Sequence, residues 1–288
     1  MVYSEYYSLD SEEFPTMKGR TSDSTGILDW RDIDWKVAKR QVSKIQKRIF
    51  RATRNARDGS GSWKTVRSLM KLLKRSFSAL LLAIQRVTQF NKWICEEAFP
   101  VRRVYIPKRN GTRRPLGIPA IWDRIGQAIL KMVYEPVFEV EFEPGSYGFR
   151  PERSCQDAHS DIFQVLKKGS SYHWVLDADI KGAFDNISHE FIMERIDGLP
   201  GRNIILGWLK AGYIEDGVFH PTKSGTPQGG IISPLLANIA LDGLQELLTD
   251  HITKTSYSTV DRGRRTTKQR KEEKFKFVRY ADDFVGAT

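Results

Sequence analysis

The order in which helical and strand patterns follow one another most constrains the fold of this chain of 288 residues. The hydrophobic periodicity predicts two N-terminal helices, a β-hairpin at 101–119, a helix at 120–140 and a short strand at 174–180. A glycine-rich loop at 224–230 leads into a further helix, and a strand–turn–strand closes the chain. Because strands and helices do not alternate as regular βαβ units, the expected fold class is α+β.

The two N-terminal helical patterns carry basic residues around an apolar stripe. Lys and Arg are dense between residues 29 and 92, whereas acids are few. The apolar stripe of the first pattern consists of Val37, Val42, Ile45 and Ile49. After GSGS at 59–62, the stripe of the second consists of Val66, Leu69, Leu73, Phe77, Leu80, Ile84 and Val87. A charged helix face is usually just solvated, but this excess of one sign favours a surface that contacts phosphate groups.

Composition indicates the kind of partner and the compartment that are expected for this chain. The formal net charge of +11 suggests a polyanion as partner, most often nucleic acid, although a merely basic protein is the alternative. Cys95 and Cys155 lack metal-ligand spacing, which favours a reducing compartment, here the cytoplasm. The acidic stretch 1–28 has no apolar run and is interpreted as a flexible leader. No apolar run is long enough to span a bilayer, so no membrane partner is expected.

Carboxylates at two places in the sequence suggest a metal site. Asp177 and Asp179 alternate on the predicted strand at 174–180 and therefore face the same way. Asp282 and Asp283 lie at the tip of the closing hairpin. Grouped carboxylates repel one another unless a cation neutralises them, and Mg²⁺ prefers such oxygen ligands. Surface acids in ordinary turns are the alternative, so an Asp-Asp pair by itself supports only a weak metal hypothesis.

Several motifs resemble those of a known family, in the expected order. The residues Tyr280–Asp283 between apolar strands resemble the YxDD signature of reverse transcriptases. Further stretches that resemble family motifs are the fingers hairpin at 102–119, the segment 146–158, the first palm carboxylate motif at 176–189 and the loop and helix at 224–244. Together with the basic helices, they resemble the group II intron-encoded branch, whose members combine reverse transcriptase and maturase functions. The resemblance covers residues 29–288.

The resemblance implies the fingers and palm of a right-hand polymerase, with an antiparallel palm sheet and helices, preceded by a basic helical extension. The expected division is a leader at 1–28, a helical extension at 29–95, and fingers and palm at 96–288 without a thumb or maturase domain. The N-terminal helices join VRRVYIPK almost directly, so a piece of the fingers that relatives carry is missing. Another chain is then a candidate source of the thumb and maturase parts.

The resemblance also assigns roles around the metal. Asp179, Asp282 and Asp283 are expected as catalytic ligands of two Mg²⁺ ions, with help from the backbone carbonyl of Ile180. Phe184 follows Asp179 by five residues and is expected to act as a steric gate that clashes with a ribose 2′-OH. A plain core aromatic is the alternative for Phe184.

The remaining expected site residues bind the nucleotide or nucleic acid. Lys108 and Arg114 are expected to hold the incoming triphosphate, with a solvated hairpin face as the alternative. Gln228 is expected near the nucleotide or template, and Arg150 at the template or a phosphate. Expected nucleic-acid contacts on the first basic helix are Arg40, Lys44, Arg48 and Arg51.

The implied function is RNA-directed DNA polymerisation, in which dNTPs are added to a primer 3′-OH by two-metal nucleotidyl transfer. The implied partners are a group II intron RNA or another RNA template, a DNA primer and dNTPs, and the activity is associated with intron splicing and mobility. The alternative is an RNA-binding, maturase-like splicing cofactor or an inactive truncated fragment. The basic helices and the stretch RGRRTTKQRK at 262–271 motivate the splicing cofactor.

Overall fold

The computed structural model describes most of the chain, namely residues 33–87, 98–108, 111–254, 257–261, 264–268 and 275–288. The expected leader at 1–28, Cys95 and part of the basic stretch at 262–271 lie outside the described residues. Within the described part, no helix combines the length and the apolar character needed to cross a membrane.

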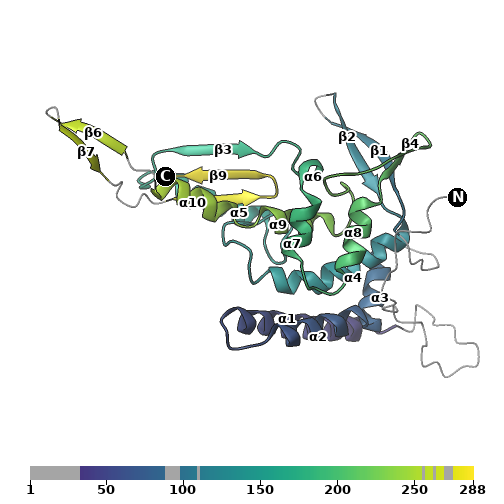
Figure 1. The fold of residues 1–288 in the computed structure, drawn as a ribbon. Coiled ribbons are helices and arrows are strands. Elements are labelled where there is room, and N and C mark those ends of the chain that lie inside the picture. The colour runs from purple at the N-terminus through teal and green to yellow at the C-terminus, as the bar shows by residue number, and fades with distance from the viewer. Residues whose placement is uncertain (1–32, 88–97, 109–110, 255–256, 262–263, 269–274) are drawn as a thin grey trace, which may run out of the picture.

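The N-terminal helices form a layer beneath the rest of the chain (Figure 1). The layer consists of α1 (Trp35–Arg57), α2 (Trp63–Lys74) and α3 (Phe77–Val87). Asp34 caps α1, because its side chain accepts hydrogen bonds from the backbone N–H groups of Lys36 and Val37 at 3.0 Å. The second predicted helix is in fact two helices, which separate near Ser76. The hydroxyl of Ser76 accepts a hydrogen bond from the Ala79 N–H at 3.4 Å and so caps a new helix start.

Helix α4 (Ile121–Phe138) joins this layer to the rest of the molecule. It packs against α1, α2 and α3 on one side and against α9 (Ser233–Leu241) on the other. Its fully or almost fully buried side chains include Ile125, Ile129, Leu130, Val133 and Val137. Burying one such side chain stabilises a fold by about 1.5–3 kcal/mol. The N-terminal helices, α4 and α9 therefore share one hydrophobic core.

A four-stranded sheet contains the predicted hairpin at 101–119. Its order is β2-β1-β4-β5, with β1 (Val101–Pro107), β2 (Arg113–Ile118), β4 (Tyr213–Glu215) and β5 (Val218–His220). The parallel pairing of β1 with β4 has no signal in the sequence pattern. The Arg103 guanidinium lies 3.8 Å from the centre of the Tyr213 ring and ties the two strands together. Helix α8 (Arg202–Lys210) leads into β4.

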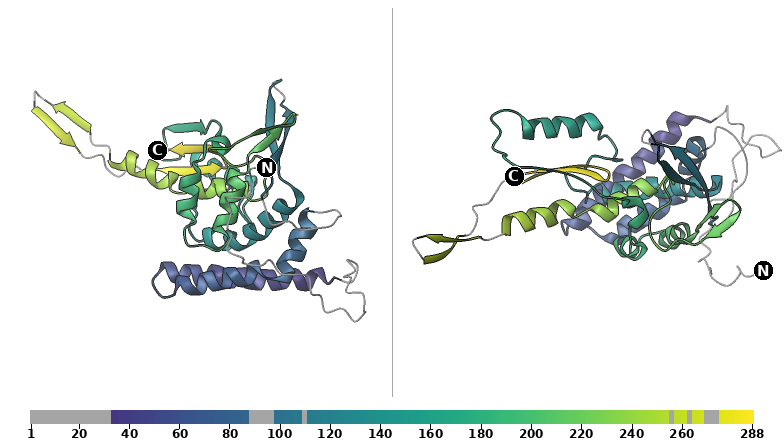
Figure 2. Two further views of the ribbon diagram at one scale, coloured as in Figure 1. Left: turned by 45° about the vertical axis from the view of Figure 1, so that its right-hand side comes forward. Right: turned by 90° about the horizontal axis from the view of Figure 1, so that it is seen from above.

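A three-stranded antiparallel sheet carries the predicted carboxylates. Its order is β3-β9-β8, with β3 (Val175–Asp179), β8 (Lys276–Tyr280) and β9 (Asp283–Ala287). Helix α5 (Cys155–Leu166) covers one face at β8, and α9 and α10 (Leu244–Lys254) lie on the other, as the right-hand view of Figure 2 shows. Two short helices, α6 (Ala183–Asn186) and α7 (His189–Arg195), follow β3. The mixed helices and antiparallel sheets confirm the α+β class.

The helix predicted after the glycine-rich loop is in fact two helices, α9 and α10. The helix predicted over ISPLLANIALDGLQELL breaks between α9 and α10 at Gly243, whose φ is +99°. The Glu143 carboxylate then caps α10 by accepting hydrogen bonds from the N–H groups of Gly243 at 3.0 Å and Gln245 at 2.7 Å. Between α10 and β8, the strands β6 (Tyr257–Asp261) and β7 (Arg264–Lys268) form a hairpin that projects away from the other elements (Figure 1).

Candidate active site

The pairing of β3 with β9 brings the predicted carboxylates together. Asp179 lies directly opposite Asp283, and Asp177 lies opposite Val285 on the same sheet face. The Ile180 N–H donates a hydrogen bond to the Asp282 carbonyl at 3.1 Å, which ties the end of β3 to the turn before β9. Residues that are distant in the sequence therefore converge at one end of the sheet.

The pKa of the Asp283 carboxyl reflects the proximity of the other aspartates. Partial burial raises the pKa of Asp283, and the negative charges of Asp282, Asp179 and Asp177 raise this pKa further. Four acidic groups therefore act on one another at the end of the sheet. A cation bound among them would relieve this repulsion.

The turn between β8 and β9 has an unusual backbone. Ala281 and Asp282 are its two central residues, and Ala281 has a φ of +61°. A left-handed conformation costs a residue with a Cβ about 1 kcal/mol, which is why glycine is usual at such a position. Backbone strain of this kind persists only where the surroundings enforce it.

The segment before α5 supplies these surroundings. Gly145 and Tyr147 exchange hydrogen bonds with Arg279, from Tyr147 N–H to the Arg279 carbonyl at 2.8 Å and from Arg279 N–H to the Gly145 carbonyl at 2.7 Å. A Cβ on Gly148 would lie only 2.3 Å from the Ala281 nitrogen, so the segment touches the turn directly. Sequence reasoning assigns Gly148 and Arg279 no role. The available signal is the arginine in FVRY, which stands two residues after Phe277 and therefore on the same, inward-facing side of the strand.

Phe184 lies on α6, the helix that follows the Asp179 strand, and is half-buried. Its ring meets the exposed Phe149 ring edge-on, with 6.3 Å between the centroids. The Phe184 carbonyl accepts a hydrogen bond from the Thr226 N–H at 2.7 Å, so the first carboxylate motif and the glycine-rich loop are docked together.

The glycine-rich loop also contacts the four-stranded sheet. The Gln228 carbonyl accepts a hydrogen bond from the Gly117 N–H in β2 at 2.7 Å. Gly229 has a φ of +125°, and a Cβ there would lie 2.7 Å from the Gly117 carbonyl oxygen, so glycine is required. Lys108 and Arg114 are exposed on the β1–β2 hairpin, and neither side chain makes an ion pair within the described residues.

Arg150 has its partners within the protein. Its side chain is buried and forms an ion pair with Glu139. The same guanidinium donates hydrogen bonds to the carbonyls of Glu143 at 2.7 Å and Ser146 at 2.8 Å. These partners engage the guanidinium inside the protein, and the expected contact with template or phosphate stays a prediction. Arg150 holds the segment that reaches the turn.

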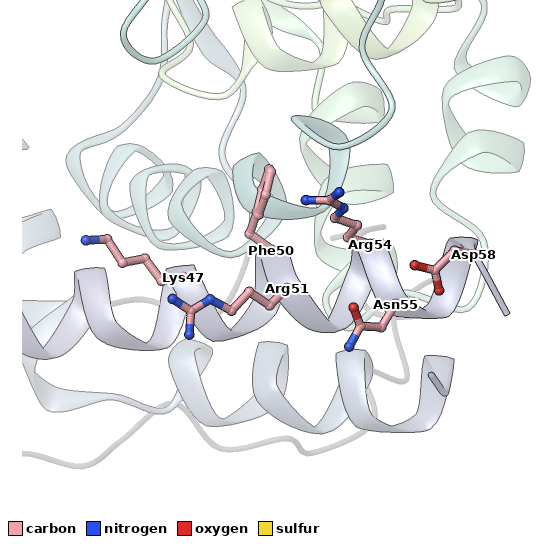
Figure 3. Close-up of a pocket in the computed structure, with 6 residues that line it drawn as sticks. All are labelled: Lys47, Phe50, Arg51, Arg54, Asn55 and Asp58. Atoms are coloured by element: carbon pink, nitrogen blue, oxygen red, sulfur yellow. The ribbon is translucent and has the colours of Figure 1, made fainter. Parts of the chain in front are cut away.

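The outward face of α1 is strongly basic. Residues Arg40, Lys44, Arg48 and Arg51 are all exposed on it, and α1 contains no acidic residue. Part of this face lines a hollow of about 460 Å³, which Figure 3 shows. The lining residues are Lys47, Phe50, Arg51, Arg54, Asn55 and Asp58. We call the exposed cations of α1 and this hollow the basic face. The exposed aromatic ring of Phe50 on it has no counterpart in the sequence prediction.

The carboxylate cluster is open rather than a closed metal centre. Within the described residues, no three His, Cys, Asp or Glu side chains are placed to hold a metal ion by themselves. Mg²⁺ is commonly bound by one or two carboxylates together with substrate phosphate oxygens. The mutual repulsion around Asp283 and the cross-strand pair with Asp179 fit a cation whose shell the substrate completes.

Comparison with known proteins agrees with this geometry. The family model of reverse transcriptase (RNA-dependent DNA polymerase) matches residues 106–288, and that of the N-terminal domain of reverse transcriptase matches residues 30–93. Protein YkfC of Escherichia coli strain K12 is 39% identical over 207 residues, which are 66% of this chain and 54% of YkfC. The group II intron-encoded protein LtrA of Lactococcus lactis is 43% identical over 154 residues, which are 52% of this chain and 25% of LtrA.

A third relative is the uncharacterized 91 kDa protein in the cob intron of Schizosaccharomyces pombe, which is 36% identical over 175 residues. The matched region covers 59% of this chain and 21% of that protein, so the chain spans only part of each of these relatives. The reverse transcriptase model, in contrast, covers more than half of the chain and includes both carboxylate strands. The chain therefore belongs to the reverse transcriptase family, with group II intron-encoded proteins among its relatives.

Proposed function

We propose that this chain is the fingers-and-palm part of a group II intron-type RNA-directed DNA polymerase. In this proposal residues 96–288 carry the chemistry and residues 29–95 form a helical extension that binds RNA. The observation that carries it is the cross-strand pair of Asp179 and Asp283, with Asp282 in the adjoining turn. The substrates are dNTPs, a primer with a free 3′-OH and an RNA template.

Polymerases of this family depend on divalent metal ions in general. Two Mg²⁺ ions, when bound, would lower the pKa of the primer 3′-OH and neutralise charge on the leaving pyrophosphate. Asp179, Asp282 and Asp283 would hold them, together with the backbone carbonyl of Ile180. The raised pKa of Asp283 is the electrostatic reason that this group of carboxylates favours a cation.

The β1–β2 hairpin supplies positive charge for the triphosphate. Lys108 and Arg114 are exposed on it and are not engaged by acids among the described residues. Arg provides paired donors for phosphate oxygens, whereas Lys provides a compact charge. Charge that develops on the leaving phosphates is stabilised when such donors are already in place. Gln228 would lie at the nucleotide or template, because its backbone joins the glycine-rich loop to the same sheet.

Phe184 would select the sugar of the incoming nucleotide. The ring lies on the helix that follows the Asp179 strand and is only half-buried, so part of it remains accessible. An aromatic ring beneath the sugar leaves no room for a ribose 2′-OH. The contact with Phe149 limits where the Phe184 ring can move.

Primer extension on an RNA template with dNTPs and Mg²⁺ tests the proposal. Asp179→Ala and Asp283→Ala should each lower incorporation more than ~100-fold, because the charge that holds the cation is removed. Asp197→Ala is the matched control, since Asp197 is an exposed acid whose ion-pair partner in the described part of the chain is Arg202 at the start of α8. Absence of extension by the wild-type chain, or full activity in the Asp179 variant, would contradict the polymerase proposal.

The basic face supports a second candidate function, that of an RNA-binding, maturase-like splicing cofactor. Cations, an exposed Phe50 ring and the Asn55 amide lie together in the hollow of Figure 3. Basic side chains that flank an aromatic ring suit a phosphate backbone with an unstacked base. Salt-dependent binding of a structured intron RNA by a chain that extends no primer would favour this candidate over the polymerase.

A further inference from the structure

A buried arginine lies directly behind the catalytic turn. Arg279 in β8 is fully buried, although a guanidinium loses much favourable hydration inside a protein. Its Nη1 donates hydrogen bonds to the Ala281 carbonyl at 3.0 Å and to Asn238 Oδ1 at 3.2 Å. The Arg279 side chain therefore holds the backbone of its own turn.

The carboxylates that balance the charge of Arg279 make no hydrogen bond with its guanidinium, so they do not compete with the Ala281 carbonyl. Burial lowers the pKa of Arg279, whereas the carboxylates of Glu143 and Asp242 raise this pKa. Neither carboxylate forms a direct hydrogen bond with the guanidinium. Glu143 caps α10 and Asp242 forms an ion pair with Arg195. Nη1 consequently remains available for the turn and for Asn238.

Asn238 connects the two segments that touch the turn. It lies in α9 with only 2% of its side chain exposed. Its Oδ1 accepts the hydrogen bond from Arg279, and its Nδ2 donates one to the Gly148 carbonyl at 2.8 Å. Gly148 in turn lies against Ala281. One buried amide thus holds both the arginine behind the turn and the backbone beside it.

We propose that Arg279 and Asn238 are positioning residues that fix the Ala281 carbonyl and thereby set the direction in which Asp282 and Asp283 leave the turn. The peptide group between Ala281 and Asp282 is the one that must rotate if a two-residue turn changes type. A positive φ at Ala281 but not at Asp282 is the pattern of a type II′ turn. A donor on the Ala281 carbonyl resists that rotation. We call the effect on the turn geometry the structural half of the proposal and the effect on catalysis the catalytic half. The catalytic half rests on the proposed polymerase function, whereas the structural half rests on these contacts alone.

Amide hydrogen exchange of the full chain tests the structural half without any substrate. Asn238→Ala should speed exchange of the Ile180 N–H, which bonds to Asp282, at least ~10-fold. Gln46→Ala is the matched control, since it also removes one amide-to-carbonyl hydrogen bond, to Met132 at 3.0 Å between α1 and α4. Equal exchange of Ile180 in the two variants would overturn the proposal.

Steady-state kinetics of primer extension test the catalytic half. Asn238→Ala should lower kcat at least ~10-fold with little change in the KM for dNTP, because the carboxylates and not the triphosphate contacts are displaced. Arg279→Lys keeps the positive charge but has no planar fork for two acceptors, so its kcat should fall between those of Arg279→Ala and wild type. A rise in KM with unchanged kcat would overturn the catalytic half. An inactive wild-type chain would contradict the polymerase proposal, and the exchange result would still decide the structural half.

Discussion

Gly148 lies so close to the Ala281–Asp282 turn that a methyl group has no room there. A Cβ would approach the Ala281 nitrogen to 2.3 Å and its Cα to 3.0 Å, and both are backbone atoms that cannot turn aside. Gly148→Ala should therefore lower the free energy of unfolding by about 1–3 kcal/mol. It should also reduce primer extension, since the turn must shift. Chemical denaturation and the extension assay measure the two effects.

Gly207→Ala provides the comparison for that prediction. A Cβ on Gly207 would meet the Ala98 Cβ at 3.7 Å, an ordinary contact, and Gly207 lies inside α8. Replacing a glycine within a helix should raise the free energy of unfolding by about 0.5–1 kcal/mol. If the Gly148 and Gly207 variants shift stability in the same direction, the close approach at the turn is not a real constraint.

Sugar selection depends on a single ring in the proposed function. Phe184→Val should increase ribonucleotide incorporation relative to deoxyribonucleotide at least ~10-fold, because space opens beneath the 2′-OH. Phe163→Val on α5 is a suitable control, since Phe163 is 60% exposed and lies on a different helix from Phe184. Competition between the two nucleotides on one template gives the ratio. An active Phe184→Val enzyme with the wild-type ratio would remove the gate assignment.

At the scale of elements, the docking of α5 onto β8 contains a charged contact. The Tyr147 hydroxyl donates to Asp161 Oδ2 at 2.7 Å, and Lys276 Nζ lies 3.0 Å from the same oxygen. These hydrogen bonds, that from Tyr147 most of all, lower the pKa of Asp161. Burial and the bond to Asp161 raise the pKa of Tyr147 to about 12. The ionised Asp161 therefore stabilises the packing of α5 on the sheet.

The pH dependence of this contact follows from the direction of the pKa shift of Asp161. Since the pKa of Asp161 is below its ordinary value of 3.8, the stabilisation is fully present above that value and is lost as the pH falls through the folded-state pKa. Asp161→Asn should thus be less stable than wild type at pH 7, and the difference should shrink toward pH 3. Urea denaturation at both pH values measures it. If the stability difference between wild type and Asp161→Asn is the same at pH 7 and pH 3, the charge of Asp161 contributes nothing to stability.

The elements that the sequence predicts well are those with a strong local signal. The β1–β2 hairpin, β3 and the β8–β9 hairpin all follow strand periodicity bounded by turn residues. The helix breaks at Ser76 and Gly243 escape prediction because the apolar stripe continues across both. The second break also needs Glu143, about a hundred residues earlier in the chain, as the cap. The strands β4 and β5 are too short for a period to show.

At the scale of the whole molecule, the sequence does not show which arginines are exposed and which are buried in ion pairs. Arg51 and Arg150 both occur in basic or motif-like stretches, yet Arg51 is exposed on α1 and Arg150 is buried against Glu139. Only the folded chain distinguishes a cation that is free to bind phosphate from one already paired. The cross-strand meeting of Asp179 and Asp283 likewise comes from tertiary pairing, which the family resemblance anticipates but local periodicity does not.

If RNA binds at the basic face as proposed, its affinity should depend on salt concentration. The triple variant Lys44→Gln, Arg48→Gln and Arg51→Gln should reduce the magnitude of the negative slope of log affinity against log salt for single-stranded RNA by about 2, since each lost phosphate contact removes about 0.7. Filter binding at several salt concentrations measures the slope. Replacing the exposed Lys168, Lys210 and Lys223 by Gln removes the same charge elsewhere and serves as control. Equal slopes in the two triple variants would exclude α1 as the RNA contact.

The projecting β6–β7 hairpin has a consequence for how the family varies in length. Its two strands pair only with each other, whereas β9 is paired on both sides, with β3 and with β8. Adding one residue at the Ala281–Asp282 turn would shift a register and turn the carboxylates to the opposite sheet face. Residues added at the far end of β6–β7 would leave every other strand in place. Insertions and deletions among related chains should therefore accumulate between α10 and β8, a few residues along the chain from a turn that tolerates none.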